Sequence, residues 1–166
     1  MMTRTFAPWV APIAEQLRQS RQEIARTAHR FLPEMWSMPS PLEGWTYKDL
    51  FAHLSTGDWV CQTILRAVIA NEPIEVDKVA NLDWVNAGNA RLLDERAERS
   101  AEDLIAEIEV EGEETQDLLT QLSEADESRT QEGAPMSLGQ YLRDAFPGHD
   151  RDHLAQLKTA LDNVML

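Results

Sequence analysis

Three of the four histidines in the sequence, His53, His149 and His153, have spacings that would let them act together. His149 and His153 are four residues apart, so on a helix their rings stand one turn apart on the same side. Two imidazoles at this spacing can bind a single metal ion. His53 lies in an earlier helical segment, about 60° from the centre of its apolar stripe, and therefore points inward. We expect the three side chains to share one divalent cation where the two segments pack together.

A purely structural role is the alternative for these histidines. A single inward histidine is more often a core residue with a hydrogen-bond partner than a ligand. No pattern in the sequence places the segment of His53 beside the segment of His149 and His153. The physical argument for a metal is that one cation would satisfy three buried imidazole nitrogens at once.

A cation held by three neutral imidazoles would keep its full positive charge and at least one open coordination position. Such an ion lowers the pKa of a bound water or thiol, so two chemistries are open: hydrolysis by an activated water and attack by an activated thiolate. The predicted ligands include no carboxylate, which argues against an iron oxygenase with two histidines and one carboxylate. The sequence has no H-E-x-x-H motif, which argues against a zincin protease.

Asp150 is the catalytic candidate beside these ligands. It falls about 20° from the centre of the last apolar stripe, where an unpaired carboxylate is costly, so we expect it to orient a histidine or act as a base. The alternative is that Pro147 rotates this turn and exposes Asp150 to water. Asp49, one turn before His53, is interpreted as a helix cap. Cys61 has apolar neighbours and is interpreted as an inert core residue rather than a nucleophile.

Weaker candidates surround the expected site. Trp45 precedes the helix that carries His53, so its ring is expected at the rim of the pocket. Asn86 and Asn89 either line the pocket or form the solvated side of their helix, and the solvated side is the preferred interpretation. Arg143 is expected in a surface ion pair with this acidic chain rather than on a substrate.

The elements that must position these residues are helices. Apolar residues recur at spacings of three and four, and strand patterns are almost absent. The pattern predicts helices over residues 9–31, 47–70, 81–98, from 101 onward after a cap at Ser100, and 148–163. Residues 33–45 and 124–136 are predicted loops, and Pro147-Gly148 is predicted to kink or split the last helical segment. We therefore expect one all-α domain over residues 1–166, a four-helix bundle with a long loop.

Composition excludes several classes of function. The chain has 15 Lys+Arg and 29 Asp+Glu and a net charge of −14, which argues against binding nucleic acids or anionic membranes. Its one cysteine excludes an internal disulfide framework. The sequence contains neither an apolar run long enough for a membrane span nor a recognisable signal peptide, so we expect a cytoplasmic protein.

Two stretches resemble the DinB-like superfamily of four-helix-bundle metalloproteins. Residues 42–54, LEGWTYKDLFAHL, are similar to its Gly-Trp loop and the D-x-x-x-H-L motif that carries the first metal histidine. Residues 149–157, HDRDHLAQL, are similar to its last-helix H-x-x-x-H pattern. The resemblance covers nearly the whole chain and implies that His53, His149 and His153 bind nickel, zinc or a similar divalent ion.

The resemblance also bears on activity. Several DinB-like families are S-transferases that use low-molecular-weight thiols, and others resemble the N-terminal domain of mycothiol-dependent maleylpyruvate isomerases. It therefore implies a metal-activated thiolate that attacks a small electrophilic molecule. The alternatives are a metal-dependent hydrolase and a non-enzymatic bundle that binds a metal or small molecule. Charge and size allow a monomer or a dimer, and the resemblance favours a homodimer, because related bundles often look dimeric.

Overall fold

The computed structural model describes residues 4–73, 82–130 and 136–164. Within these ranges the long elements are helices: α1 (Ala11–Ala28), α2 (Tyr47–Ile69), α4 (Leu82–Arg96), α5 (Ala101–Leu119) and α7 (Phe146–Val164). Short helical turns join them: η1 (Pro33–Ser37), η2 (Glu124–Asp126), α6 (Leu138–Gln140) and η3 (Tyr141–Ala145). Over the same ranges, extended pairing is limited to a single bridge between Pro39 and Thr46. The all-α prediction is confirmed.

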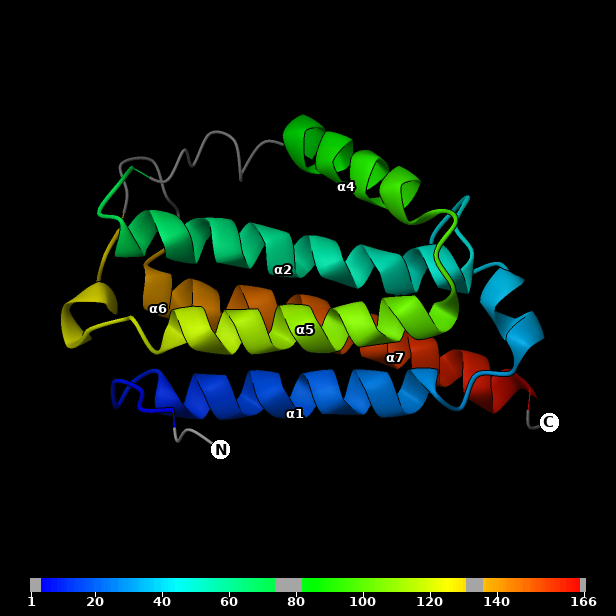
Figure 1. The fold of residues 1–166 in the computed structure, drawn as a ribbon, viewed down its shortest axis with the longest axis horizontal. Helices are drawn as coiled ribbons and strands as arrows, with labels where there is room; N and C mark the ends of the chain where they lie inside the picture. Colours follow the sequence, from blue (N-terminus) through cyan, green and yellow to red (C-terminus); the bar gives the residue numbers. More distant parts are fainter. Residues whose placement is uncertain (1–3, 74–81, 131–135, 165–166) are drawn as a thin grey trace.

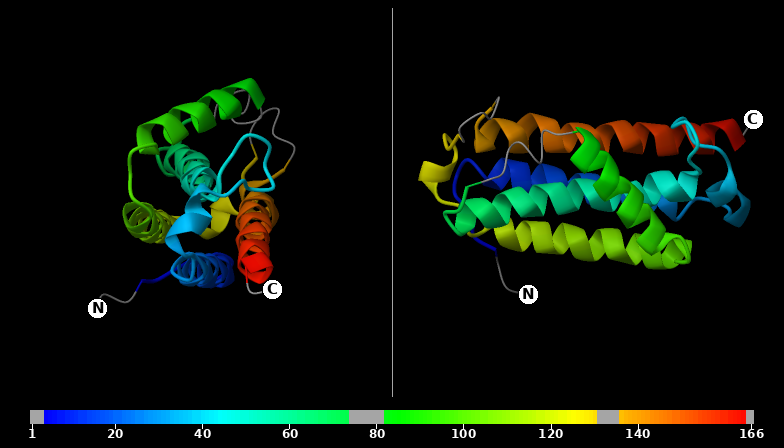
Figure 2. Two further views of the ribbon diagram at one scale, coloured as in Figure 1. Left: turned by 90° about the vertical axis from the view of Figure 1, so that its right-hand side faces the viewer. Right: turned by 90° about the horizontal axis from the view of Figure 1, so that it is seen from above.

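Helices α1, α2, α5 and α7 run side by side along the long axis of the molecule (Figure 1). Helix α5 packs against α1 and α2, and α7 packs against the same two helices from the other side, so the four close into a bundle (Figure 2). Helix α4 crosses the outside of α2. This packing places α2, which carries His53, directly beside α7, which carries His149 and His153.

The apolar core of the bundle is divided into two clusters. One cluster contains Ile24, Leu50 and Leu157, and the other contains Leu17, Leu65 and Phe146. Between them along the chain, the four bundle helices carry buried polar side chains: Arg21 on α1, Ser55, Thr56 and Asp58 on α2, Thr115 and Gln116 on α5, and Asp150 and His153 on α7. A polar layer therefore crosses the middle of the bundle, and such a layer requires paired or ligated groups.

The predicted starts of α2 and α5 are confirmed in atomic detail. Thr46 Oγ1 accepts a hydrogen bond from the Asp49 N–H at 3.2 Å, and Asp49 Oδ2 accepts one from the Thr46 N–H at 2.9 Å. This reciprocal arrangement satisfies two N–H groups that the helix leaves unpaired. Asp49 is thus the cap of α2, as interpreted from the sequence. Ser100 caps α5 in the same way.

The last helical segment is divided, but not by a gap at Pro147-Gly148. The division is a π turn, Tyr141–Ala145, in which the Phe146 N–H bonds to the Tyr141 carbonyl. Helix α7 then starts at Phe146, so Pro147 falls in its first turn, where its missing N–H costs little. His149 consequently lies on regular helix, in phase with His153.

None of the described helices is both long and apolar enough to cross a lipid bilayer.

Candidate metal centre

The three predicted histidines converge at the interface of α2 and α7. One ring nitrogen from each of His53, His149 and His153 lies within 4.8 Å of the other two. The Nε2 atoms of His53 and His149 are 3.2 Å apart. The ring centroid of His153 lies 5.0 Å from that of His53 and 4.5 Å from that of His149. The structure therefore brings together the three side chains that the sequence singled out, and their role as ligands stays a prediction.

Gln156 fixes the His153 ring from behind. The Gln156 Oε1 atom lies 2.8 Å from His153 Nδ1. An amide oxygen only accepts hydrogen bonds, so Nδ1 carries the proton and Nε2 keeps its lone pair. Histidines that bind metals are commonly held this way on their other nitrogen. Sequence analysis missed Gln156, although its spacing of three residues from His153 on one helix was a usable signal.

Asp150 lies behind the His149 ring. Its side chain is fully buried, and its Oδ1 atom is 3.7 Å from His149 Nδ1. That nitrogen is itself buried and makes no hydrogen bond to another group. The prediction that Asp150 points inward is confirmed, and exposure by Pro147 did not occur. The prediction that Asp150 takes part in a reaction stays a prediction.

Gly57 makes room for His149, and sequence analysis did not identify it as part of the site. A Cβ atom at this position of α2 would lie 2.8 Å from both Cε1 and Nδ1 of His149. Carbon and nitrogen atoms do not approach so closely, so any larger residue would push the imidazole away. A glycine inside a helix lowers its stability by about 1 kcal/mol relative to alanine, and here that cost has a packing reason.

The rim of the site is formed by Trp45 and Asn89. The Trp45 ring lies 5.0 Å from the His53 ring, as expected from its place before α2. Gly44, with φ at +80°, makes the turn that presents it. Asn89 is half-buried and interacts with His53, so its interpretation as solvated surface was wrong. Asn86 is exposed, as interpreted.

The electrostatics of the site favour neutral imidazoles at His53 and His153. Burial, reinforced by the neighbouring His149 and His153, lowers the pKa of His53 to about 3, although Asn89 opposes the shift. Burial also lowers the pKa of His153, against a raising contribution from Gln156. Neutral imidazoles are the form that binds metal ions, since a proton and a metal compete for the same lone pair. The donor set therefore fits a divalent cation.

Other sequence candidates lie away from the histidines. Cys61 is fully buried, and burial raises the pKa of its thiol well above the ordinary value, which agrees with an inert core residue. Arg143 forms an ion pair with Glu127, as expected for a surface arginine. His29 is exposed just beyond the end of α1.

Comparison with known proteins agrees with this geometry. Residues 17–158 match the family described as the mycothiol maleylpyruvate isomerase N-terminal domain. No curated protein and no solved structure gave a significant match. The matched range covers most of the chain and includes all three histidines. The chain therefore belongs to the mycothiol maleylpyruvate isomerase N-terminal domain family, within the DinB-like superfamily of helical bundles.

Proposed function

We propose that this protein is a divalent-metal-dependent enzyme that transfers a small thiol to an electrophilic molecule. The observation that carries the proposal is the convergence of three imidazoles from two helices on one point of the bundle. The family match supports it, because the family is named for an isomerase that depends on mycothiol, a low-molecular-weight thiol.

In this proposal His53, His149 and His153 hold the ion, and nickel and zinc are the preferred candidates. With three neutral ligands, the ion would keep its charge and an open position, so it would lower the pKa of a thiol bound there. Gln156, which holds the protonated nitrogen of His153, would leave the other ring nitrogen free for the ion. The thiol must come from outside the chain, because the one cysteine, Cys61, is fully buried.

We assign Asp150 a positioning role rather than direct proton transfer to the substrate. Its carboxylate is fully buried behind His149 and is paired with Arg21 at 3.1 Å. A hydrogen bond from His149 Nδ1 to this carboxylate would leave Nε2 free to bind the ion. In the reaction, the thiol sulfur forms a bond to the electrophilic carbon, the leaving group departs with its electron pair, and the thiol proton passes to solvent.

The test is a transfer assay on untagged protein loaded with nickel or zinc, with mycothiol or glutathione as thiol and monochlorobimane as electrophile. We expect thioether formation that requires metal, thiol and His153, so His153→Ala should keep its helical circular dichroism and lose turnover. His29→Ala changes an exposed histidine outside the site and is the matched control. Turnover that survives both chelation and His153→Ala would contradict the proposal. Metal-dependent ester cleavage without thiol would identify a hydrolase, and metal binding without either reaction would identify a binding protein.

A further inference from the structure

Arg21 is a buried arginine on α1, the neighbouring helix that contributes no histidine to the site. Its guanidinium lies over the Phe146 ring, 5.8 Å from the centroid. Its aliphatic stem passes Gly112, where an added Cβ would lie 3.3 Å from Arg21 Cγ. Burying an arginine is costly unless its charge is paired. The role of Arg21 therefore follows from the groups that pair with its charge.

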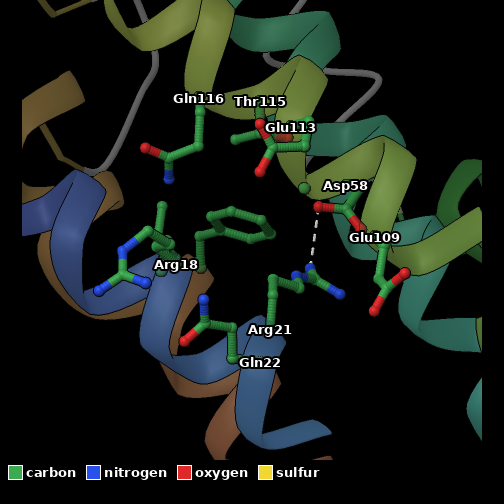
Figure 3. A pocket seen from close by; sticks show the side chains of 11 residues that line it. Arg18, Arg21, Gln22, Asp58, Glu109, Glu113, Thr115 and Gln116 are labelled. Carbon is green, nitrogen blue, oxygen red and sulfur yellow. Dashed lines mark hydrogen bonds and ion pairs between the residues drawn. The ribbon is translucent and has the colours of Figure 1, made fainter. Parts of the chain in front are cut away.

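A single nitrogen of Arg21 bridges the two helices that carry the histidines. Its Nη2 atom lies 2.9 Å from Asp58 Oδ1 on α2 and 3.1 Å from Asp150 Oδ1 on α7. Figure 3 shows the bond to Asp58 at the inner wall of a cavity of about 310 Å³. None of the three histidines lines that cavity. Arg21 thus reaches the site from behind, on the side of α1 and α5.

One of the two carboxylates follows a predicted ligand in the chain, and the other follows the glycine that contacts this ligand. Asp58 follows Gly57, which contacts the His149 ring, and Asp150 follows His149 itself. The Asp150 oxygen that pairs with Arg21 is also the one that lies 3.7 Å from His149 Nδ1. Ser20 Oγ donates to the other Asp150 oxygen at 3.4 Å. The direction of this carboxylate is therefore set from α1.

The charges of this cluster are unbalanced. One guanidinium faces two buried carboxylates, which gives a formal net charge of −1 when all three groups are ionised. Burial raises the pKa of Asp58 to about 7 even though Arg21 lowers it, so this excess charge is complete only above that pH. A cation at the adjacent histidines would have the opposite sign to this excess charge.

We infer that Arg21 is a positioning residue for the three-histidine site: it clamps α2 to α7 through Asp58 and Asp150 and holds the Asp150 carboxylate behind His149. The inference rests on the proposed function, because it concerns the same ion. In this arrangement α1, which carries no ligand, fixes the distance between α2 and α7, which carry the three ligands.

The test compares Arg21→Lys with Arg18→Lys. Lysine keeps the charge, but its side chain is one bond shorter, so its Nζ atom should not reach both carboxylates at the 2.9 and 3.1 Å distances of Arg21 Nη2. Arg18 lies one turn earlier on α1, is exposed, and pairs only with Glu15 among the described salt bridges. Zn²⁺ affinity is measured by competition with a chromogenic chelator, and ligand geometry by the visible spectrum of the Co²⁺-loaded protein. For Arg21→Lys we expect Zn²⁺ binding about 10- to 100-fold weaker and a changed Co²⁺ spectrum. Arg18→Lys should match wild type.

A second variant covers the case in which Arg21→Lys does not fold. The triple variant Arg21→Met, Asp58→Asn, Asp150→Asn removes every charge of the cluster, so no buried charge is left unpaired. The same loss of Zn²⁺ affinity is expected, with a smaller rise of Tm on adding Zn²⁺ than wild type shows. Wild-type affinity and Co²⁺ spectrum in either folded variant would overturn the inference. Failure of wild type itself to bind Zn²⁺ would instead overturn the proposed function, so the two failures are distinguishable.

Discussion

Replacing Gly57 by alanine should strongly weaken metal binding at the proposed site while leaving the bundle folded. The added Cβ would lie 2.8 Å from Cε1 and Nδ1 of His149, whereas ordinary contacts begin at 3.4 Å. The ring must therefore move by about 0.6 Å or more, which exceeds the roughly 0.2 Å tolerance of metal–ligand distances. His149 would leave its position 3.2 Å from His53 Nε2. The loss of one ligand of three predicts Zn²⁺ binding weaker by a factor of about 100 or more, or about 2.7 kcal/mol.

The fold should survive this change, because the atoms that must move belong to a side chain and not to the backbone. Alanine also favours the helix over glycine by about 1 kcal/mol, which offsets part of the strain. Gly148→Ala is the matched control, since its Cβ would make an ordinary 3.6 Å contact with Arg151 on the same helix as His149. Zn²⁺ affinity is measured by chelator competition and the free energy of unfolding by urea titration. The reasoning is refuted if Gly57→Ala binds Zn²⁺ as tightly as Gly148→Ala and wild type.

Three further predictions concern other parts of the site. Gln156→Ala frees the proton-bearing nitrogen of His153 and should weaken Zn²⁺ binding about 10-fold with unchanged circular dichroism; unchanged affinity would show that this contact does not orient the ring. Cys61→Ala should leave metal binding and thiol transfer unchanged, because the thiol is buried and its pKa is raised; loss of transfer in a folded variant would instead make this cysteine part of the reaction. In the metal-free protein, the folded pKa of His53 lies at about 3, below its ordinary 6.5, so the unfolded chain binds more protons between these values and this group makes the free energy of unfolding rise with pH there. Asp58 has its pKa raised to about 7, so the folded chain binds more protons there and this group makes the free energy of unfolding fall from about pH 4 to 7. The free energy of unfolding of His53→Gln, measured by urea titration, should therefore rise less with pH, or fall more steeply, between pH 4 and 6.5 than that of wild type. Equal slopes of this free energy against pH would contradict the pKa assigned to His53.

Features that depend on neighbours in the chain were predictable from the sequence. Helical periodicity predicted the helix over residues 9–31 that contains α1, and Asp49 was recognised as the cap of α2. The inward direction of His53 and His153 followed from their angles to apolar residues on the same helix.

Features that depend on packing between helices were not predictable in this way. Gly57 is explained only by the His149 ring on another helix, and Arg21 only by two carboxylates distant in the chain. The same holds for Asn89, whose burial depends on how α4 crosses α2. Periodicity within a helix does not fix which helices are neighbours, and in this bundle the neighbours assemble the site.

The central claim is that His53, His149 and His153 bind one ion together. Its most direct test is elemental analysis of the untagged protein after equilibrium dialysis against Ni²⁺ and Zn²⁺, wild type beside His53→Ala. We predict about one equivalent of bound metal per wild-type chain and far less than one in a folded His53→Ala variant. Wild-type protein without stoichiometric metal, or His53→Ala that retains it, would contradict the claim.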